Sequence, residues 1–258
     1  MKLLGIVVLL VMLAAAGCVA NTTPEPGPQA PRTAMVNISS NGQTYPAYVS
    51  ASAGTGTYPG IVLIHSFNGF EPGYLTLVDK FATEGYVVIA PQWQTFNKTP
   101  GDKDVRALVE STTAYLKTRT DVDTKHFGLT GFCAGGRYTM LFLPQLKDFR
   151  SGVAWYGFPY SGGFANETRP VDYIGNLSVP MLMIHGSSDQ VSPVTDIYKY
   201  ADALHQSGKY FELKVYQGEP HGFMVQNGKM NENDVARNAF GEMVEFFNRT
   251  LKGPGISL

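Results

Sequence analysis

A glycine-rich segment in the middle of the chain, residues 131–137, sets Cys133 between small residues at a predicted strand-to-helix junction. The apolar run before it is typical of a buried strand, and the apolar run after it is typical of the start of a buried helix. Glycines keep side-chain bulk out of the sharp turn between two such elements. The positive end of the following helix would favour a thiolate at Cys133. This layout is typical of a nucleophile elbow, although these seven residues alone leave a buried, inert cysteine open.

Predicted strands and helices alternate on both sides of this segment. The strands cover residues 35–39, 44–49, 60–65, 86–90, 127–130, 152–157, 181–186 and 211–216. From the third strand onward helices lie between them, with predicted bounds at 74–82, 102–120, 193–205 and 233–251 and one more after the glycine-rich segment. This pattern predicts an α/β fold with a mostly parallel eight-stranded sheet and helices on both faces. A chain of 258 residues suits one core, so we expect a single domain over residues 34–252.

Three loops that follow predicted strands hold the side chains needed for nucleophilic catalysis. They carry Cys133, Asp189 and His221. The carboxyl ends of parallel strands meet at one edge of a sheet, so we expect these side chains to come together there. Their order along the chain (nucleophile, acid, histidine) is that of the α/β-hydrolases. Asp196 and Asp172 are second choices for the acid.

The predicted chemistry gives each of these groups a role. His221 would take the thiol proton of Cys133 and later return a proton to the leaving group. Asp189 would orient the imidazole and stabilise its charged form. The backbone N–H groups of Ala134 and Phe67 would form an oxyanion hole for the tetrahedral intermediate.

The first 33 residues have the composition of an export signal followed by a tether. Residues 3–16 form an apolar run that suits a secretory signal, and small residues then precede Cys18. Residues 1–18 therefore resemble a signal peptide with a lipobox, in which Cys18 is lipidated; an ordinary cleavable signal with an incidental cysteine is the alternative. Residues 19–33 are rich in proline and predict a flexible tether. We expect an exported, extracytoplasmic protein that is held at the cell membrane if Cys18 is modified.

Asparagine positions also favour exposure outside the cytoplasm. Six of the twelve asparagines lie in Asn-x-Ser/Thr sequons, at Asn21, Asn37, Asn97, Asn166, Asn176 and Asn248. The serine and threonine content of the chain predicts fewer by chance, which suggests contact with a glycosylating compartment or cell surface.

The remaining composition argues against nucleic-acid and metal binding. The net charge of −1 offers no basic patch for nucleic acid. The chain has two cysteines and no Cys/His ligand spacing, so we do not expect a structural zinc site. The other histidines are predicted to be structural: His65 and His185 would brace loops, and His126 and His205 would lie at the surface.

Three motifs together give the chain a resemblance to the dienelactone hydrolase family. They are Gly-Phe-Cys-Ala-Gly-Gly-Arg at 131–137, His-Gly-Ser-Ser-Asp at 185–189 and Pro-His-Gly-Phe at 220–223. The similarity extends over about residues 35–251. It implies a Cys-His-Asp triad that acts on small esters or lactones through a thioester acyl-enzyme, without cofactor or metal.

One position departs from the family's pattern, and the pocket residues are predicted from their place in the chain. Well-studied members carry a glutamate after the third strand, where this chain has Ser66, which we expect to lie at the substrate pocket. The resemblance therefore does not bring substrate-triggered activation, or the family's dienelactone substrate, to this chain. A cap over residues 157–180 could cover the site, with an apolar pocket lined by Phe67, Trp93, Phe158, Tyr160 and Phe164. Ordinary packing of these aromatic side chains is the alternative.

The sequence is compatible with two functions. The first is an exported hydrolase of small esters or lactones, for which a monomer is favoured. The second is a surface-anchored binding lipoprotein that keeps the fold but has lost catalysis. Reactivity of Cys133 in the folded protein separates them.

Overall fold

The computed structural model describes residues 30–254, so the predicted signal peptide and most of the predicted tether lie outside the described residues. Eight strands form one sheet in the order β1-β2-β4-β3-β5-β6-β7-β8. Their bounds are β1 Arg32–Ser40, β2 Gln43–Ala51, β3 Tyr58–Ile64, β4 Val87–Pro91, β5 Val122–Phe132, β6 Phe149–Trp155, β7 Met181–Gly186 and β8 Phe211–Tyr216. The strands from β4 to β8 in this order pair in parallel, whereas β1, β2 and β4 pair antiparallel. The predicted α/β class and the mostly parallel sheet are confirmed.

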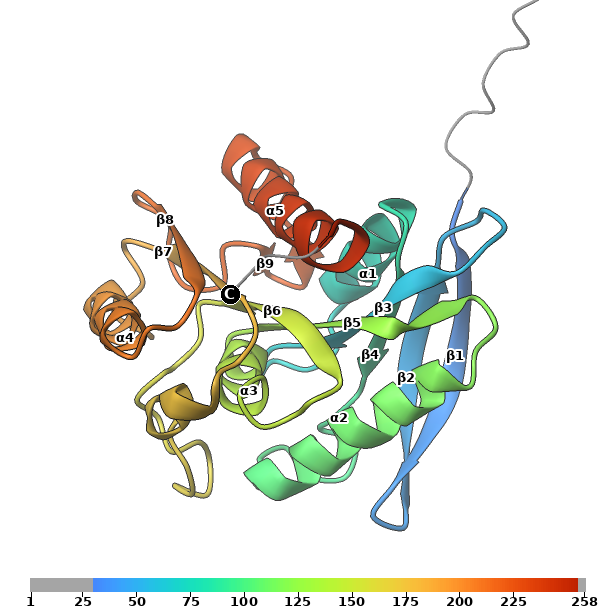
Figure 1. Ribbon diagram of the computed structural model, residues 1–258, viewed down its shortest axis with the longest axis horizontal. Helices are drawn as coiled ribbons and strands as arrows, with labels where there is room; N and C mark the ends of the chain where they lie inside the picture. The colour runs from blue at the N-terminus through green and yellow to red at the C-terminus, as the bar shows by residue number, and fades with distance from the viewer. Residues whose placement is uncertain (1–29, 255–258) are drawn as a thin grey trace, which may run out of the picture.

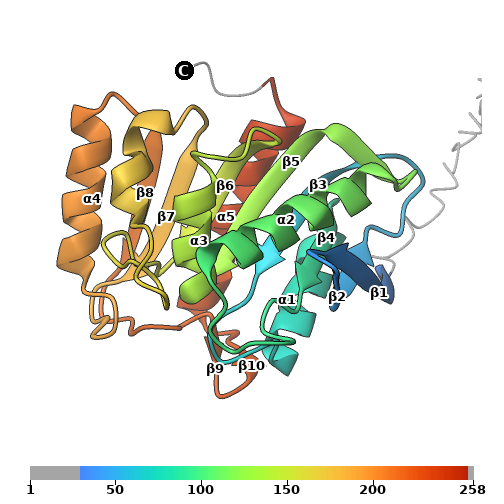
Figure 2. The same cartoon turned by 90° about the horizontal axis from the view of Figure 1, so that it is seen from below.

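Helices cover both faces of the sheet. Figure 1 shows α1 (Pro72–Thr83) and α5 (Asp234–Phe247) on one side, and α2 (Asp102–Lys117), α3 (Ala134–Phe142) and α4 (Val194–Gln206) on the other. In Figure 2, α2, α3 and α4 lie on the side of the sheet that faces the viewer. Successive side chains of a strand point to opposite faces of the sheet, so each buried strand contributes to both cores. In β3, Ile61 and Leu63 join the core under α1 and α5, while Val62 and Ile64 join the opposite core. The apolar run predicted at this strand is therefore buried on both faces.

The structure extends some predicted elements and adds short ones. β5 begins at Val122, five residues before the predicted strand. Val122 is buried and pairs with Tyr58 of β3, but residues 123–126 are polar and at least partly exposed, and the register with β3 shifts there. A 3₁₀ helix at Pro170–Asn176, a two-stranded sheet of β9 (Val225–Gln226) and β10 (Lys229–Met230), and a π-helical turn at Asn248–Lys252 carry too few residues for a periodic signal.

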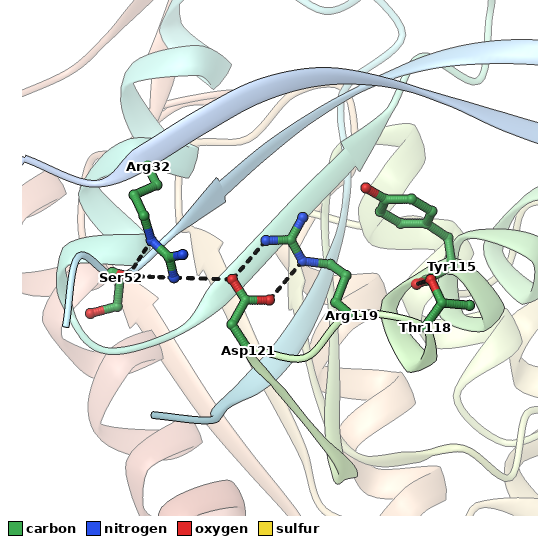
Figure 3. Close-up of polar contacts among 6 residues, drawn as sticks. All are labelled: Arg32, Ser52, Tyr115, Thr118, Arg119 and Asp121. Atoms are coloured by element: carbon green, nitrogen blue, oxygen red, sulfur yellow. Dashed lines mark hydrogen bonds and ion pairs between the residues drawn. The ribbon is translucent and has the colours of Figure 1, made fainter. Parts of the chain in front are cut away.

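The first strand begins earlier than the predicted domain boundary. β1 starts at Arg32, so the last two residues of the predicted tether belong to the sheet. The Arg32 guanidinium donates to the Ser52 carbonyl at 3.2 Å and to the Asp121 carboxylate at 3.0 Å. Figure 3 shows Asp121 held between Arg32 and Arg119. These contacts tie the start of the edge strand to the body of the domain.

Two functional features can be assessed over residues 30–254. No helix in this range is both long and apolar enough to cross a membrane. Within the same range, no group of three or more His, Cys, Asp or Glu side chains is arranged to hold a metal ion.

Candidate active site

Cys133 occupies a strained turn between the end of β5 and the start of α3. Its backbone has φ 57° and ψ −115°, a conformation that a non-glycine residue adopts only when its surroundings enforce it. A Cβ at Gly131 would lie 2.2 Å from the carbonyl oxygen of Gly135, and a Cβ at Gly135 would lie 2.0 Å from that of Ile64. Side chains are excluded at both positions, which explains the glycines that flank the cysteine.

Asp189 is buried in the loop after β7, and each of its oxygens is used. Oδ1 accepts hydrogen bonds from the amides of Val191 at 2.9 Å and Ser192 at 2.7 Å, while Oδ2 accepts from Nδ1 of His221 at 2.7 Å. Burial alone would raise the pKa of Asp189, but the hydrogen bonds from His221 and the Ser192 amide outweigh it and lower that pKa below its usual value. The carboxylate is therefore held ionised and fixed in orientation.

His221 lies in the loop after β8, with its ring between Asp189 and the turn of Cys133. Burial favours the neutral imidazole, but the hydrogen bond to Asp189 and the proximity of Cys133 outweigh it and raise the pKa of His221 to about 9. The ring packs edge-on against Tyr156 with centroids 5.0 Å apart, and Phe158 lies at 5.5 Å. Nε2 is buried and has no hydrogen-bond partner among the described residues. The imidazole is thus anchored through one nitrogen, and the other nitrogen is left for chemistry.

Of the other histidines described here, His185 comes close to this pair, with Nε2 3.3 Å from Oδ2 of Asp189. His185 donates from Nε2 to the carbonyl of Ser192 at 2.8 Å, which braces the loop of Asp189. His65 donates from Nδ1 to the carbonyl of Ser66 at 2.8 Å, and burial lowers its pKa to about 4. The remaining two, His126 and His205, lie partly or fully exposed. Of the second-choice acids, Asp172 pairs with Arg169, and neither Asp172 nor Asp196 bonds His221 within the part of the chain described here.

A cavity of about 300 Å³ opens beside Cys133. Its wall is mainly aromatic and small side chains: Phe67, Cys133, Ala134, Arg137, Tyr138, Phe158, Ser161, Gly163, Phe164 and Val191. The two residues predicted to supply an oxyanion hole, Ala134 and Phe67, both line it. Neither of their backbone amides donates a hydrogen bond to another residue of the described range. Both N–H groups therefore have no protein partner within residues 30–254.

Three side chains predicted at the pocket lie outside this wall. Trp93 is buried one layer behind it, where it stacks on Phe164 with centroids 6.3 Å apart and donates from Nε1 to the carbonyl of His65. Tyr160 faces α4 instead, with the ammonium of Lys199 4.7 Å from its ring centroid. The prediction was wrong for both because chain position shows that an aromatic residue is near the site but not which way it points.

Ser66 is the third of these side chains. It is buried, its Oγ accepts a hydrogen bond from the Asn68 amide at 3.3 Å, and its own amide donates to the hydroxyl of Tyr74 at 3.2 Å. Its polar groups are thus used within the loop. The position where well-studied relatives carry an acid contributes no charge to the cavity.

Arg137 lines the cavity, although the sequence analysis gave it no role. Its guanidinium forms two hydrogen bonds with the Asp102 carboxylate, at 2.7 and 2.8 Å, and also donates to the carbonyls of Ser161 and Thr168. Arg137 lies in the first turn of α3, directly after the elbow of Cys133, and this place in the chain is the signal that could have found it.

Comparisons with known proteins agree with the family that the three motifs indicate. A sequence model of the dienelactone hydrolase family matches residues 45–251. A protein of Salmonella typhimurium named "Putative carboxymethylenebutenolidase" is 26% identical over 231 residues, which cover 83% of this chain and 86% of the relative. A protein of the same name from Methylorubrum extorquens is 29% identical over 157 residues, 60% of this chain and 54% of that protein.

Solved structures share the fold. A Klebsiella pneumoniae protein described as a "Putative Dienelactone Hydrolase" superposes with a TM-score of 0.79 at 23% identity, over 86% of this chain and 100% of that one. A dienelactone hydrolase-like promiscuous phosphotriesterase from metagenomic libraries gives 0.73 at 13% identity, over 86% and 100%. The chain belongs to the dienelactone hydrolase family of α/β-hydrolases, as its three motifs predict.

Proposed function

We propose that this protein hydrolyses small carboxylic esters or lactones with Cys133 as nucleophile, His221 as general base and acid, and Asp189 as the group that orients His221. The observation that carries the proposal is the 2.7 Å hydrogen bond from His221 Nδ1 to a buried Asp189, combined with a buried Nε2 that has no partner among residues 30–254. That arrangement fixes the imidazole and leaves one basic nitrogen beside Cys133. The Cys133 backbone at φ 57° supports the same role, since a strained conformation of this kind is often maintained at a reacting residue.

The first half of the reaction would transfer the acyl group to sulfur. Nε2 of His221 takes the proton of the Cys133 thiol, and the sulfur forms a bond to the carbonyl carbon. The carbonyl oxygen becomes an oxyanion, which the amides of Ala134 and Phe67 would stabilise. His221 then donates its proton to the ester oxygen as the carbon–oxygen bond breaks, which releases an alcohol and leaves a thioester. With a lactone, the new hydroxyl stays attached to the acyl group.

The second half would release the acid. Water attacks the thioester carbonyl and gives a proton to Nε2 of His221. The carbon–sulfur bond breaks, the proton returns to Cys133, and the carboxylic acid leaves. His221, with a pKa of about 9, binds a proton more tightly than an ordinary imidazole, which favours removal of the thiol proton in the first step.

Turnover of short-chain p-nitrophenyl esters and a panel of lactones tests the proposal. The full chain should hydrolyse them, and Cys133→Ala should lose nearly all of this activity. A brief reaction with an activated ester should add one acyl mass to Cys133, and neutral hydroxylamine should remove it because it cleaves thioesters faster than oxygen esters. Equal turnover by the two proteins, or an acyl mass at another residue, would contradict the role of Cys133.

We also propose that the domain is exported and held at a membrane through lipid on Cys18. Support comes from the sequence of residues 1–18, where an apolar run ends in small residues before the cysteine. The full chain expressed with its leader should partition into Triton X-114 detergent, and Cys18→Ser should move it to the aqueous phase. Partition of both proteins into water would reject the anchor and leave an ordinary signal peptide.

Glycosylation at the sequons remains part of the same proposal. Four of the described sequon asparagines are exposed: Asn37, Asn97, Asn166 and Asn176. The fifth, Asn248, is half-buried, and its Oδ1 accepts a hydrogen bond from the Tyr86 hydroxyl at 2.8 Å. Peptide mass spectrometry of protein from its native source should find glycans at the exposed positions. Unmodified asparagine at all of them would reject this part.

A further inference from the structure

The cavity beside Cys133 has a wall of almost uncharged groups. Among the described residues that line it, Arg137 is the one with a charged side chain, and the others are aromatic, aliphatic or small. The volume of about 300 Å³ has room for about ten water-sized groups at roughly 30 Å³ each. A ligand that fills it buries mostly carbon.

The charge of Arg137 is already neutralised. Its guanidinium has five N–H donors. Two bind the Asp102 carboxylate, and two more bind the carbonyl oxygens of Ser161 and Thr168. Thr168 also donates from Oγ1 to Asp102 at 2.9 Å, which fixes the acid in place. Four of the five N–H groups are therefore occupied, and the charge is paired with a buried carboxylate, so an anionic ligand would gain little from this cation.

The other nearby cations do not replace it. His221 is hydrogen-bonded to Asp189, so the positive charge that it carries when protonated is paired with that carboxylate. Lys98 lies 5.1 Å from the ring centroid of Phe67, but it is exposed, outside the wall, and screened by water and salt. The outer wall residues Phe164 and Val191 are 43% and 62% exposed and apolar. An incoming group therefore meets carbon before it reaches the sulfur.

We propose that this cavity selects uncharged, apolar acyl or alcohol groups of about ten non-hydrogen atoms and rejects groups that carry a carboxylate. The proposal rests on the function proposed above, since Cys133 is the group that acts on the bound ester. A carboxylate placed here would lose its water and gain no free cation in return, which makes its transfer into the cavity unfavourable.

A matched pair of thiol reagents tests the charge preference without turnover. N-propylmaleimide and 3-maleimidopropionic acid place a methyl group or a carboxylate at the end of similar chains. The full chain is treated with each, and the rate of addition at Cys133 is followed by peptide mass spectrometry, which separates it from Cys18. Each rate is divided by the rate with 2-mercaptoethanol. We expect the neutral reagent to be favoured by at least about tenfold, because the buried carboxylate stays unpaired.

Two substitutions at the exposed Val191 sharpen the test. Val191→Lys adds a free cation at the mouth of the cavity and should raise the rate with the acid reagent alone. Val191→Met adds a similar length of carbon without charge and should leave the preference as it was. The Val191 amide that binds Asp189 belongs to the backbone and is kept in both.

Equal rates with the two reagents in the unmodified chain, or a faster acid reagent, would overturn the proposal. So would a Cys133 that neither reagent reaches without denaturant, since the cavity would then admit no ligand. Ester turnover is measured on the same samples. A preference for the neutral reagent without any turnover keeps the charge selectivity and rejects the hydrolase, whereas turnover of neutral and acid esters at equal rates does the opposite.

Discussion

Two buried aspartates lie close to the cavity, and their partners separate a reactive pair from a structural one. Asp189 binds His221, whose second nitrogen has no partner within the described chain. Asp102 binds Arg137, whose other donors reach the carbonyls of Ser161 and Thr168. A guanidinium cannot give up its proton in a protein, but an imidazole can. The same residue type therefore has two roles: Asp189 positions a side chain that can carry a proton, and Asp102 fixes a side chain in the wall of the cavity.

Replacing His221 should give the largest effect on the reactive pair. Without an imidazole, Cys133 lacks a base and the leaving oxygen lacks an acid, so we expect kcat/KM for a p-nitrophenyl ester to fall by about three to four orders of magnitude in His221→Ala. His205→Ala, on the exposed face of α4, is the matched control and should keep full activity. A loss as large in the control, or a small loss in His221→Ala, would count against the assignment.

Replacing Asp102 should break the structural pair. Asp102→Ala leaves the Arg137 cation buried without its carboxylate, and we expect the free energy of unfolding to fall by about 3–5 kcal/mol in urea denaturation. Asp104→Ala removes an exposed acid from the same turn of α2 and should change it by less than about 0.5 kcal/mol. If the two variants are equally stable, the pair does not hold the wall.

The proton affinity of His221 should depend on Asp189. NMR titration of the imidazole should give a pKa of about 9 in the unmodified protein. In Asp189→Asn the anion is gone while the burial remains, so the pKa should drop substantially. Asp196→Asn replaces an acid with no hydrogen bond to His221 and should leave the titration unchanged. A pKa that stays near 9 in Asp189→Asn would show that Asp189 does not set it.

The same shift predicts how stability changes with pH. The folded-state pKa of His221, about 9, lies above its ordinary value of 6.5, so proton binding stabilises the fold. This contribution is fully present below about pH 6.5 and is lost as the pH rises through about 9. Urea denaturation over this window should show a steeper decline for the unmodified protein than for Asp189→Asn. Parallel declines would contradict the linkage.

The smallest effect is expected from one hydrogen bond of the structural pair. Thr168→Val removes the Oγ1 donor to Asp102 but keeps the backbone carbonyl that Arg137 binds. We expect a loss of about 1 kcal/mol in the free energy of unfolding, measured in urea. Ester turnover should be unchanged, because neither Cys133 nor His221 contacts this hydroxyl. A marked fall in turnover at unchanged stability would assign Thr168 to the reactive pair instead.

The sequence carries much of the fold and part of the site because those features are local. Short stretches of sequence show the glycines beside Cys133 and the apolar runs that precede the loops of Asp189 and His221. Parallel strands bring such loops to one edge of the sheet. The strand at Val122–Phe132 begins earlier than predicted because polar residues at 123–126 interrupt its apolar run, and Val122 and Asp123 join the sheet through pairing with β3.

The rest of the site depends on contacts between distant segments. Arg137 and Asp102 are 35 positions apart, and no periodicity relates them. Trp93 and Tyr160 show the converse: both are close to the site in the chain, yet one packs behind the wall and the other turns toward Lys199. Which side chain faces a cavity is decided by packing in three dimensions, and a linear pattern does not contain it.

The position of Arg137 has a consequence for the order in which the protein assembles. Its partners Asp102, Ser161 and Thr168 lie 35, 24 and 31 positions away in the chain. Contacts between distant segments carry a loop-closure entropy cost that hydrogen bonds within a helix do not, so we expect them to arise after the helices. The wall of the cavity therefore closes late during refolding. During refolding, ester turnover should return later than the helical circular dichroism signal. The helices would then form before the cavity can bind a substrate.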